Sequence, residues 1–446
     1  MTTKRSGALV RTVLAVAVLA AVVAGCGSSS SSSSSTSGSK TTAANSNVKG
    51  NISIVGIWVA QEQTNFQRVV AAFNKQYPNV HVKYNPAGDN TPTVLSTALA
   101  GGRPPDLASV GQPGLVKQFQ KQGKLKDLDF ARQDISANFS PDLVKLGTIN
   151  GKLYTFLPKG ANKSTVWYNV SAFKNAGIQP PKTWDQFLKD AQTIKASGTP
   201  AYAFGAGDEW PLTDIFENLY IRQAGAQKYD QLSTHAIKWT DPSVKATLTQ
   251  MAKLFSDSSN IAGGTSGSLQ MDFPTSVSQV FVNPPKAAME IEGDFVPGVV
   301  AGKTQLKPGT GYNVFDFPSV NGSQPTVVGG GDSLIMFKDS PASEAFVKFM
   351  ASPQAGKTWV AQGGVSSPNK NVPPSAYPDP ITRATAVKLA KASTFRFDMS
   401  DLAPASFGGT PGQGEWKILA DFMKNPKDVD GTASALETAA AKAFKS

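Results

Sequence analysis

The chain has 446 residues, a formal net charge of +11 and only 17% charged residues, with one cysteine and two histidines. A single cysteine excludes a disulfide within the chain, and so few Cys and His residues exclude a clustered Cys/His zinc site. The basic residues are scattered, with no block of five or more, so they predict a solvated surface rather than the basic stripe of a nucleic-acid-binding protein.

The N-terminal residues predict export. Lys4, Arg5 and Arg11 precede an apolar run over residues 13–24, which is too short for the ~20 helical residues of a membrane span. The segment Val23-Ala24-Gly25-Cys26 resembles the bacterial lipobox, which is cut before its cysteine. Residues 1–25 are therefore expected to be a lipoprotein signal peptide, and acylated Cys26 to hold the protein at the outer face of the cytoplasmic membrane. Stable anchoring needs more than one acyl chain.

Residues 26–50 include eight consecutive serines and very few apolar side chains. Such a segment cannot bury enough surface to fold, so it predicts a flexible tether of roughly 25–30 Å. Folding is expected to begin at about Asn51, and the remaining length favours two lobes over a single core.

The elements that follow alternate between strand and helix. Apolar patterns predict strands at 52–58, 80–84 and 107–110, with helices at 62–76, 93–100 and 114–122. Further helices are expected at 184–195, 212–224, 242–255, 343–350 and 433–445, and a strand at 334–337. This alternation predicts an α/β fold with mostly parallel sheets.

Five local segments carry more specific information. They are Phe-Asn-Lys-Gln-Tyr-Pro-Asn-Val at 73–80, Ala-Gly-Gly-Arg-Pro-Pro-Asp at 100–106, Trp-Tyr-Asn followed by Pro-Lys-Thr-Trp-Asp-Gln-Phe within 167–187, Ala-Ala-Met-Glu-Ile-Glu-Gly-Asp at 287–294, and residues 343–359. In this order, over nearly all of residues 51–446, they resemble the extracellular solute-binding proteins of ABC importers. Within that family the resemblance is to the carbohydrate-binding group that includes the maltose-binding proteins.

The resemblance implies a two-lobed, periplasmic-binding-protein-like fold of class II. Each lobe would be a mixed, mostly parallel sheet flanked by helices, and the hinge would be crossed more than once. The expected first lobe is 51–160 plus 286–332, and the expected second lobe is 161–285 plus 333–446. A monomer without cofactor or metal would capture a carbohydrate by closing its cleft, and would deliver it to the permease subunits of an ABC transporter.

A sugar site needs aromatic faces for the apolar sides of the rings and planar polar groups for the hydroxyls. The candidates lie in predicted loops: Trp58, Glu62, Asn90 beside Asp89, Gln112, Asn162, Lys163, Asp208, Glu209, Trp210, Asp294, Phe295, Asp332 and Trp416. Phe295 stands where the resembled family often has Trp. Structural roles compete with this interpretation: Trp58 as a core residue, Asn162 as part of the hinge, and Asp294 as a helix cap.

Other functions are less well supported by the residues. No His-Glu-x-x-His and no Gly-x-x-x-x-Gly-Lys-Ser/Thr motif occurs, and the adjacent Asp208 and Glu209 cannot easily oppose each other as glycosidase carboxyls do. The sequence thus favours a binding protein over an enzyme. A peptide, polyamine or glycerophosphodiester ligand, or a role as a surface sensor, remains open, although the candidate loops contain no arginine and so favour neutral polyols.

Overall fold

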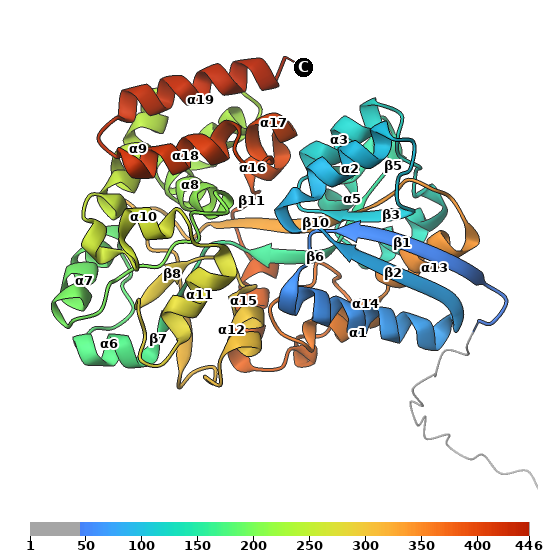
Figure 1. Ribbon diagram of the computed structural model, residues 1–446, viewed down its shortest axis with the longest axis horizontal. Helices are drawn as coiled ribbons and strands as arrows, with labels where there is room; N and C mark the ends of the chain where they lie inside the picture. The colour runs from blue at the N-terminus through green and yellow to red at the C-terminus, as the bar shows by residue number, and fades with distance from the viewer. Residues whose placement is uncertain (1–44, 446) are drawn as a thin grey trace, which may run out of the picture. The chain divides into compact units, whose positions relative to one another are not determined.

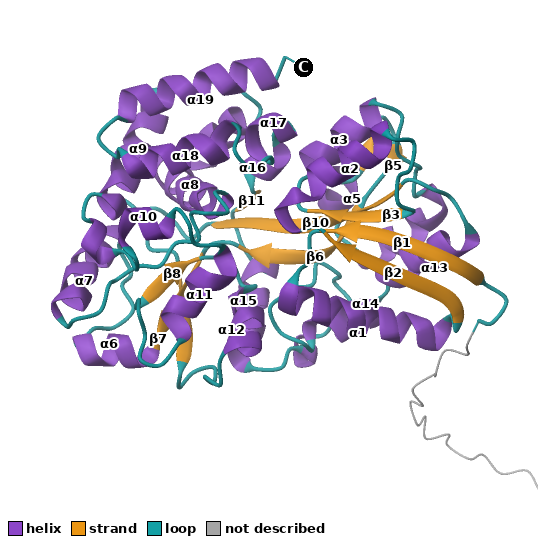
Figure 2. Ribbon diagram, in the orientation of Figure 1, coloured by secondary structure: helices purple, strands orange, loops and turns teal. Residues whose placement is uncertain are grey.

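The computed structural model describes residues 45–445, which form two α/β lobes (Figures 1 and 2). The predicted signal peptide and Cys26 lie outside the described residues. The first strand, β1 (Lys49–Gly56), begins three residues earlier than the strand predicted at 52–58, because Lys49, Gly50 and Asn51 pair with Asn79, Val80 and His81 of the neighbouring strand. The end of the predicted tether therefore belongs to the folded part.

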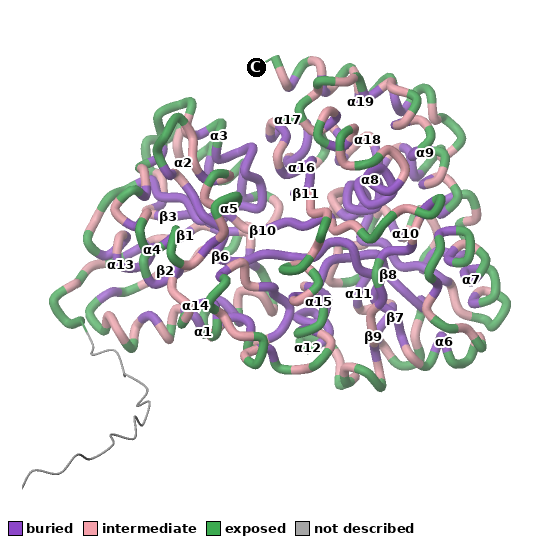
Figure 3. The backbone as a smooth tube through the Cα atoms, turned by 180° about the vertical axis from the view of Figure 1, so that it is seen from behind, coloured by how far each residue is buried: buried purple, intermediate pink, exposed green. Residues whose placement is uncertain are grey.

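The first lobe is built on a six-stranded sheet. Five strands follow the order β11-β10-β3-β1-β2, and the sixth, β6, pairs with residues 329–334 of β10. Its remaining strands are β2 (Asn79–Pro86), β3 (Leu107–Val110), β6 (Phe156–Asn162), β10 (Val327–Met336) and β11 (Phe395–Phe397). Strands β2 and β3 run parallel to β1, whereas β10 runs antiparallel to both β3 and β6. Figure 3 shows β6 and β10 buried through the middle of the molecule.

The helices of the first lobe bury aromatic side chains against this sheet. They are α1 (Ala60–Gln76), α2 (Thr91–Ala100), α3 (Pro113–Lys121), α4 (Arg132–Asn138), α5 (Pro141–Leu146), α13 (Pro341–Met350) and α14 (Pro353–Val360), beside a small hairpin of β4 (Thr148–Ile149) and β5 (Lys152–Leu153). Phe66 and Phe73 of α1 pack with Phe346 of α13 and Trp359 of α14 in one core. Helix α15 (Pro380–Ala390) packs on β6.

The second lobe has a three-stranded sheet in which β7 (Thr165–Asn169) lies between β8 (Met289–Ile291) and β9 (Tyr312–Asp316). Both outer strands run antiparallel to β7, so this sheet departs from the mostly parallel expectation. The parallel pairings in this lobe are isolated bridges: Tyr202 to Ile261 and Met289, Thr183 to Ser319, and Pro308 to Tyr312. Its helices are α6 (Val170–Ala176), α7 (Trp184–Ala196), α8 (Trp210–Ser233), α9 (Pro242–Phe255), α10 (Gly264–Ser268), α11 (Phe273–Phe281), α12 (Val296–Lys303), α16 (Met399–Leu402), α17 (Ala405–Gly408), α18 (Gly414–Lys424) and α19 (Val429–Ala443).

The predicted lobe boundaries after residue 285 are wrong. Most of 286–332 belongs to the second lobe, because β8 and β9 pair with β7. Conversely, 333–360 belongs to the first lobe, because the end of β10 pairs with β3 and helices α13 and α14 pack beside α1. Hydrophobic patterns identify strands but not the sheet that each strand joins, so the second and third crossings could not be located from spacing.

Local sequence signals explain many helix boundaries. In the Pro-Lys-Thr-Trp segment, the Thr183 hydroxyl caps α7 by accepting from the Gln186 N–H, and Trp184 turns into the core. Helix α9 begins with a capping aspartate, Asp241, followed by a proline. The helix predicted to end at residue 224 does end there: Gly225 (φ 82°, ψ 165°) is non-helical, and a second helical segment follows it within α8.

Candidate ligand-binding site

A cavity of about 360 Å³ lies between the lobes. Its first-lobe wall follows the ends of β1 and β3, and its second-lobe wall is formed by the starts of α8, α11 and α18 together with α12. A volume of this size falls within the range of pockets that bind small molecules. The cavity is therefore the candidate ligand-binding site.

Strand β6 crosses the floor of the cavity and carries Lys159, and Lys163 follows directly after the strand ends. Lys159 and Lys163 are four residues apart, and side chains alternate along a strand, so both line the cavity. The Lys159 ammonium lies 2.5 Å from Glu62 and 3.1 Å from Asp332, both of the first lobe. Burial lowers the pKa of Lys159, but Asp332 and Glu62 outweigh burial, so the pKa is raised and the amine stays charged.

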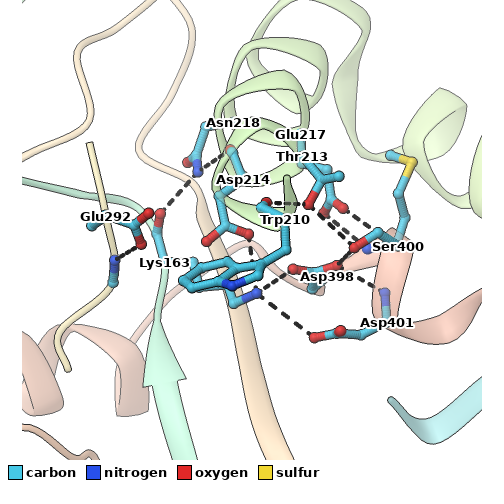
Figure 4. Close-up of polar contacts among 12 residues, drawn as sticks. Lys163, Trp210, Thr213, Asp214, Glu217, Asn218, Glu292, Asp398, Ser400 and Asp401 are labelled. Carbon is cyan, nitrogen blue, oxygen red and sulfur yellow. Dashed lines mark hydrogen bonds and ion pairs between the residues drawn. The ribbon is translucent and has the colours of Figure 1, made fainter. Parts of the chain in front are cut away.

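Lys163 makes the corresponding contacts with the second lobe (Figure 4). Its ammonium pairs with Asp398, lies 3.0 Å from Asp214 and is 3.7 Å from Asp401. Burial raises the pKa of Asp398, yet Lys163 together with hydrogen bonds from Glu217 and the Asp401 N–H outweighs burial and holds that pKa well below its usual range. For Asp214 burial dominates and the pKa rises to about 8. The ionised partner of Lys163 at neutral pH is therefore Asp398, while Asp214 largely keeps its proton.

A buried carboxyl of α8 positions the segment that follows β11. Glu217 accepts a hydrogen bond from the backbone N–H of Ser400 at 3.0 Å (Figure 4). It also accepts from the backbone N–H of Met399 at 2.8 Å and from the Tyr229 hydroxyl. Asp398 caps the short helix α16 through the Asp401 N–H at 3.0 Å. These contacts place Ser400 and Asp401 at the cavity wall.

Aromatic rings on the cavity wall come from the second lobe. Trp210, Phe273 and Phe295 form a cluster with ring centroids 5.3–5.9 Å apart, and Trp416 adds a fourth, deeply buried ring. The Lys163 ammonium lies 5.6 Å from the centre of the Trp210 ring, within cation–π range. The second lobe thus offers flat apolar faces to a ligand, and the first lobe offers mainly polar groups.

Two carboxyls line the cavity from opposite lobes without an ion-pair partner among the described residues. Asp89 of the first lobe has a pKa raised to about 7, first by burial and then by the charge of Asp208. Asp208 accepts the Phe273 N–H at 2.7 Å, and burial raises its pKa as well. Both carboxyls are available to bind hydroxyls of a ligand.

The structure places most of the sequence-predicted residues at this cavity. Eight of them line it: Glu62, Gln112, Lys163, Asp208, Trp210, Phe295, Asp332 and Trp416. Their contact with a ligand remains a prediction.

Five predicted residues do not line the cavity, and protein contacts account for four of them. Trp58 is fully buried among aromatic rings and donates its indole N–H to Asp332 at 2.6 Å, so it supports the site from behind. The Asn162 side chain accepts the Ser164 N–H, Glu209 accepts the Gly412 N–H, and Asp294 accepts the Asn162 N–H. Asn90 is exposed, and its neighbour Asp89 faces the cavity instead.

Several cavity residues were not predicted. Lys159 could have been found from the alternation in β6, two pleats before Lys163. Phe273 follows Asp272, the same aspartate–phenylalanine pair that marked Phe295, so the sequence did carry a signal for it. Ser400 and Asp401 reach the cavity only because α16 packs on α8 and α3.

A ligand-sized cavity between two α/β lobes joined by three chain crossings defines a solute-binding protein of class II. The family model described as bacterial extracellular solute-binding protein matches residues 59–357, and the chain belongs to this family. It is a family of binding proteins rather than enzymes. None of the helices in the described part of the chain combines the length and apolar character that crossing a membrane requires.

Among curated relatives, the chain is similar to the alpha-glucosides-binding periplasmic protein AglE of Rhizobium meliloti, with 30% identity over 87% of this chain and 86% of AglE. It is also similar to the osmoprotective compounds-binding protein GgtB of Synechocystis sp., with 28% identity over 85% of this chain and 90% of GgtB. Among solved structures, the bacterial solute receptor AcbH superposes with a TM-score of 0.77 at 19% identity, covering 89% of this chain and all of AcbH. The two-lobed fold is thereby confirmed.

Proposed function

We propose that the protein captures a sugar or oligosaccharide in the interlobe cavity and delivers it to the permease of an ABC transporter. The observation that carries this proposal is the cluster of Trp210, Phe273 and Phe295 on one wall, opposite carboxyl and amide groups on the other. Such a wall stacks against the apolar faces of pyranose rings while polar groups bind the hydroxyls. The names of AglE and of the melibiose/raffinose/stachyose-binding protein MelE support a carbohydrate ligand.

Binding by this geometry depends on both lobes. The aromatic cluster belongs to the second lobe, and Glu62, Asp89 and Gln112 belong to the first. A ligand held between them contacts both walls only when the lobes are close together, so binding shifts the molecule toward the closed state. The permease would then distinguish loaded from empty protein by this closure.

We further propose that the mature protein starts at Cys26 and is anchored by lipid at the outer face of the cytoplasmic membrane. The lipobox-like segment before Cys26 and the serine-rich residues after it support this arrangement. Mass spectrometry of the N-terminal peptide would test it. An acylated Cys26 is expected, and a Cys26→Ser variant should leave the membrane fraction.

Intrinsic tryptophan fluorescence of the full chain, titrated with a panel of mono- and oligosaccharides, tests the ligand class. A saturable change is expected with at least one sugar. Trp210→Ala should remove the binding, while Trp210→Phe, which keeps a flat ring, should retain most of it. A folded protein that responds to no sugar but binds a peptide, polyamine or phosphodiester would replace this proposal with the alternative of another solute.

A further inference from the structure

The cavity is limited at two places where the lobes touch. At one, helix α12 meets the start of α1: a Cβ on Gly302 would lie 2.9 Å from Gln61 Oε1 and 3.2 Å from Gln61 Cβ. At the other, a Cβ on Gly409 would lie 2.8 Å from Gln112 Cγ. Gln61, Gly302 and Gln112 all line the cavity, so these contacts are parts of its boundary.

Two further sides are set by charged groups. The floor is formed by β6 and by Lys163, which follows it. The ammonium groups of Lys159 and Lys163 are already paired with carboxylates of the two lobes. Asp89 and Asp208 line the cavity from opposite lobes, close enough for the charge of Asp208 to raise the pKa of Asp89. The lobe contacts at Gln61 and Gln112, the floor and the two aspartates therefore bound the cavity.

The volume of the cavity limits how many sugar rings the ligand can have. A cavity of about 150 Å³ accommodates benzene, which has six non-hydrogen atoms, and at that ratio 360 Å³ holds about 14 such atoms. A hexose has about 12 non-hydrogen atoms, a disaccharide about 23 and a trisaccharide about 34, so space for about 14 such atoms takes one ring, leaves a second ring only partly inside the cavity and excludes a third.

We propose that the closed cleft accepts a saccharide of at most two pyranose rings, and that Gln61 at the α1–α12 contact is the residue that stops a third. This rests on the proposed carbohydrate function. Gln61 supplies the only side chain of this residue pair, because Gly302, which it contacts on α12, has none. The Gln61 amide donates to Asn65 Oδ1 one turn along α1 at 3.0 Å, which holds the side chain across the end of the cavity.

The test is isothermal titration calorimetry of the full chain with gluco-, galacto- and xylo-oligosaccharides of one to four rings. In the series that binds, affinity should fall at least tenfold from two rings to three. Gln61→Ala should reduce that fall to less than threefold. Gly267→Ala, at a site with open space around the Cβ position and no strained backbone, should behave as the wild type.

The outcomes separate the two proposals. Wild-type affinity for three rings within threefold of that for two would overturn the size limit while leaving a carbohydrate-binding function intact. A full tenfold fall that persists in folded Gln61→Ala would overturn the role of Gln61. Absence of binding to every member of the panel would overturn the proposed function, and the size limit with it.

Discussion

Replacement of Lys163 by methionine tests the electrostatics of the cavity floor. The ammonium pairs with Asp398 and lies 3.0 Å from Asp214, and both carboxyl groups are fully buried. Removing one partner of a buried ion pair leaves the other charge without compensation, which costs about 3–5 kcal/mol. At about 2–4 °C per kcal/mol for a large domain, Lys163→Met should lower the melting temperature by about 6–20 °C.

The loss should depend on pH with a defined sign. In the wild type the pKa of Asp398 is depressed, so its contribution to stability is present at neutral pH and lost in acid. Without Lys163, burial keeps raising the pKa of Asp398 and only the hydrogen bonds from Glu217 and the Asp401 N–H still lower it, so we expect the pKa to rise and the variant to lose stability as the pH rises from 5 to 8. Lys163→Met combined with Asp398→Asn should recover part of the loss at pH 8.

Thermal unfolding followed by circular dichroism, with and without ligand, measures these effects. A matched control is Lys152→Met, which removes an exposed pair with Asp127 of similar length (2.9 Å) and should change the melting temperature little. If the melting temperature of Lys163→Met lies within 2 °C of the wild-type value at pH 8, the ion pair between Lys163 and Asp398 does not stabilise the cavity floor.

Three further predictions follow from single contacts. The folded-state pKa of Asp89 is raised to about 7, so its contribution to stability is present in acid and lost as the pH rises toward 7. The melting temperature of the ligand-free protein should therefore fall between pH 5 and 8, and it should fall less in Asp89→Asn. Gly114→Ala would bring a Cβ 1.9 Å from the Ala403 carbonyl oxygen, and denaturant unfolding should show a loss of about 2–3 kcal/mol, whereas Gly267→Ala should show none. Burial holds the pKa of Glu217 well above its usual range, so Glu217→Gln should melt close to the wild type at pH 7 and Glu217→Ala far below it.

Much of the fold is determined by local sequence. The predicted strand at 107–110 and the predicted helix at 242–255 agree with β3 and α9 at both ends, because apolar periodicity, an aspartate cap and a proline act within a few residues. Trp184, at the start of the helix predicted at 184–195, is buried in the core. The sequence also marked the loops that supply Gln112, Trp210 and Phe295, because each follows a strand or precedes a helix at the cleft side of its lobe.

Only the tertiary structure decided which strand joins which sheet and which side chain of a loop faces the cavity. Asp89 and Asn90 are polar neighbours of similar size, and the short 3-10 turn Gly88–Asn90 before α2 places one at the cavity and the other in solvent. Ser400 and Asp401 lie some 240 residues from Lys163 along the chain and reach it through the packing of α16 on α8. Local patterns record the burial of a side chain but not the identity of a distant partner, so the cavity floor, with its paired lysines and buried carboxyls, emerges only when the chain has crossed between the lobes.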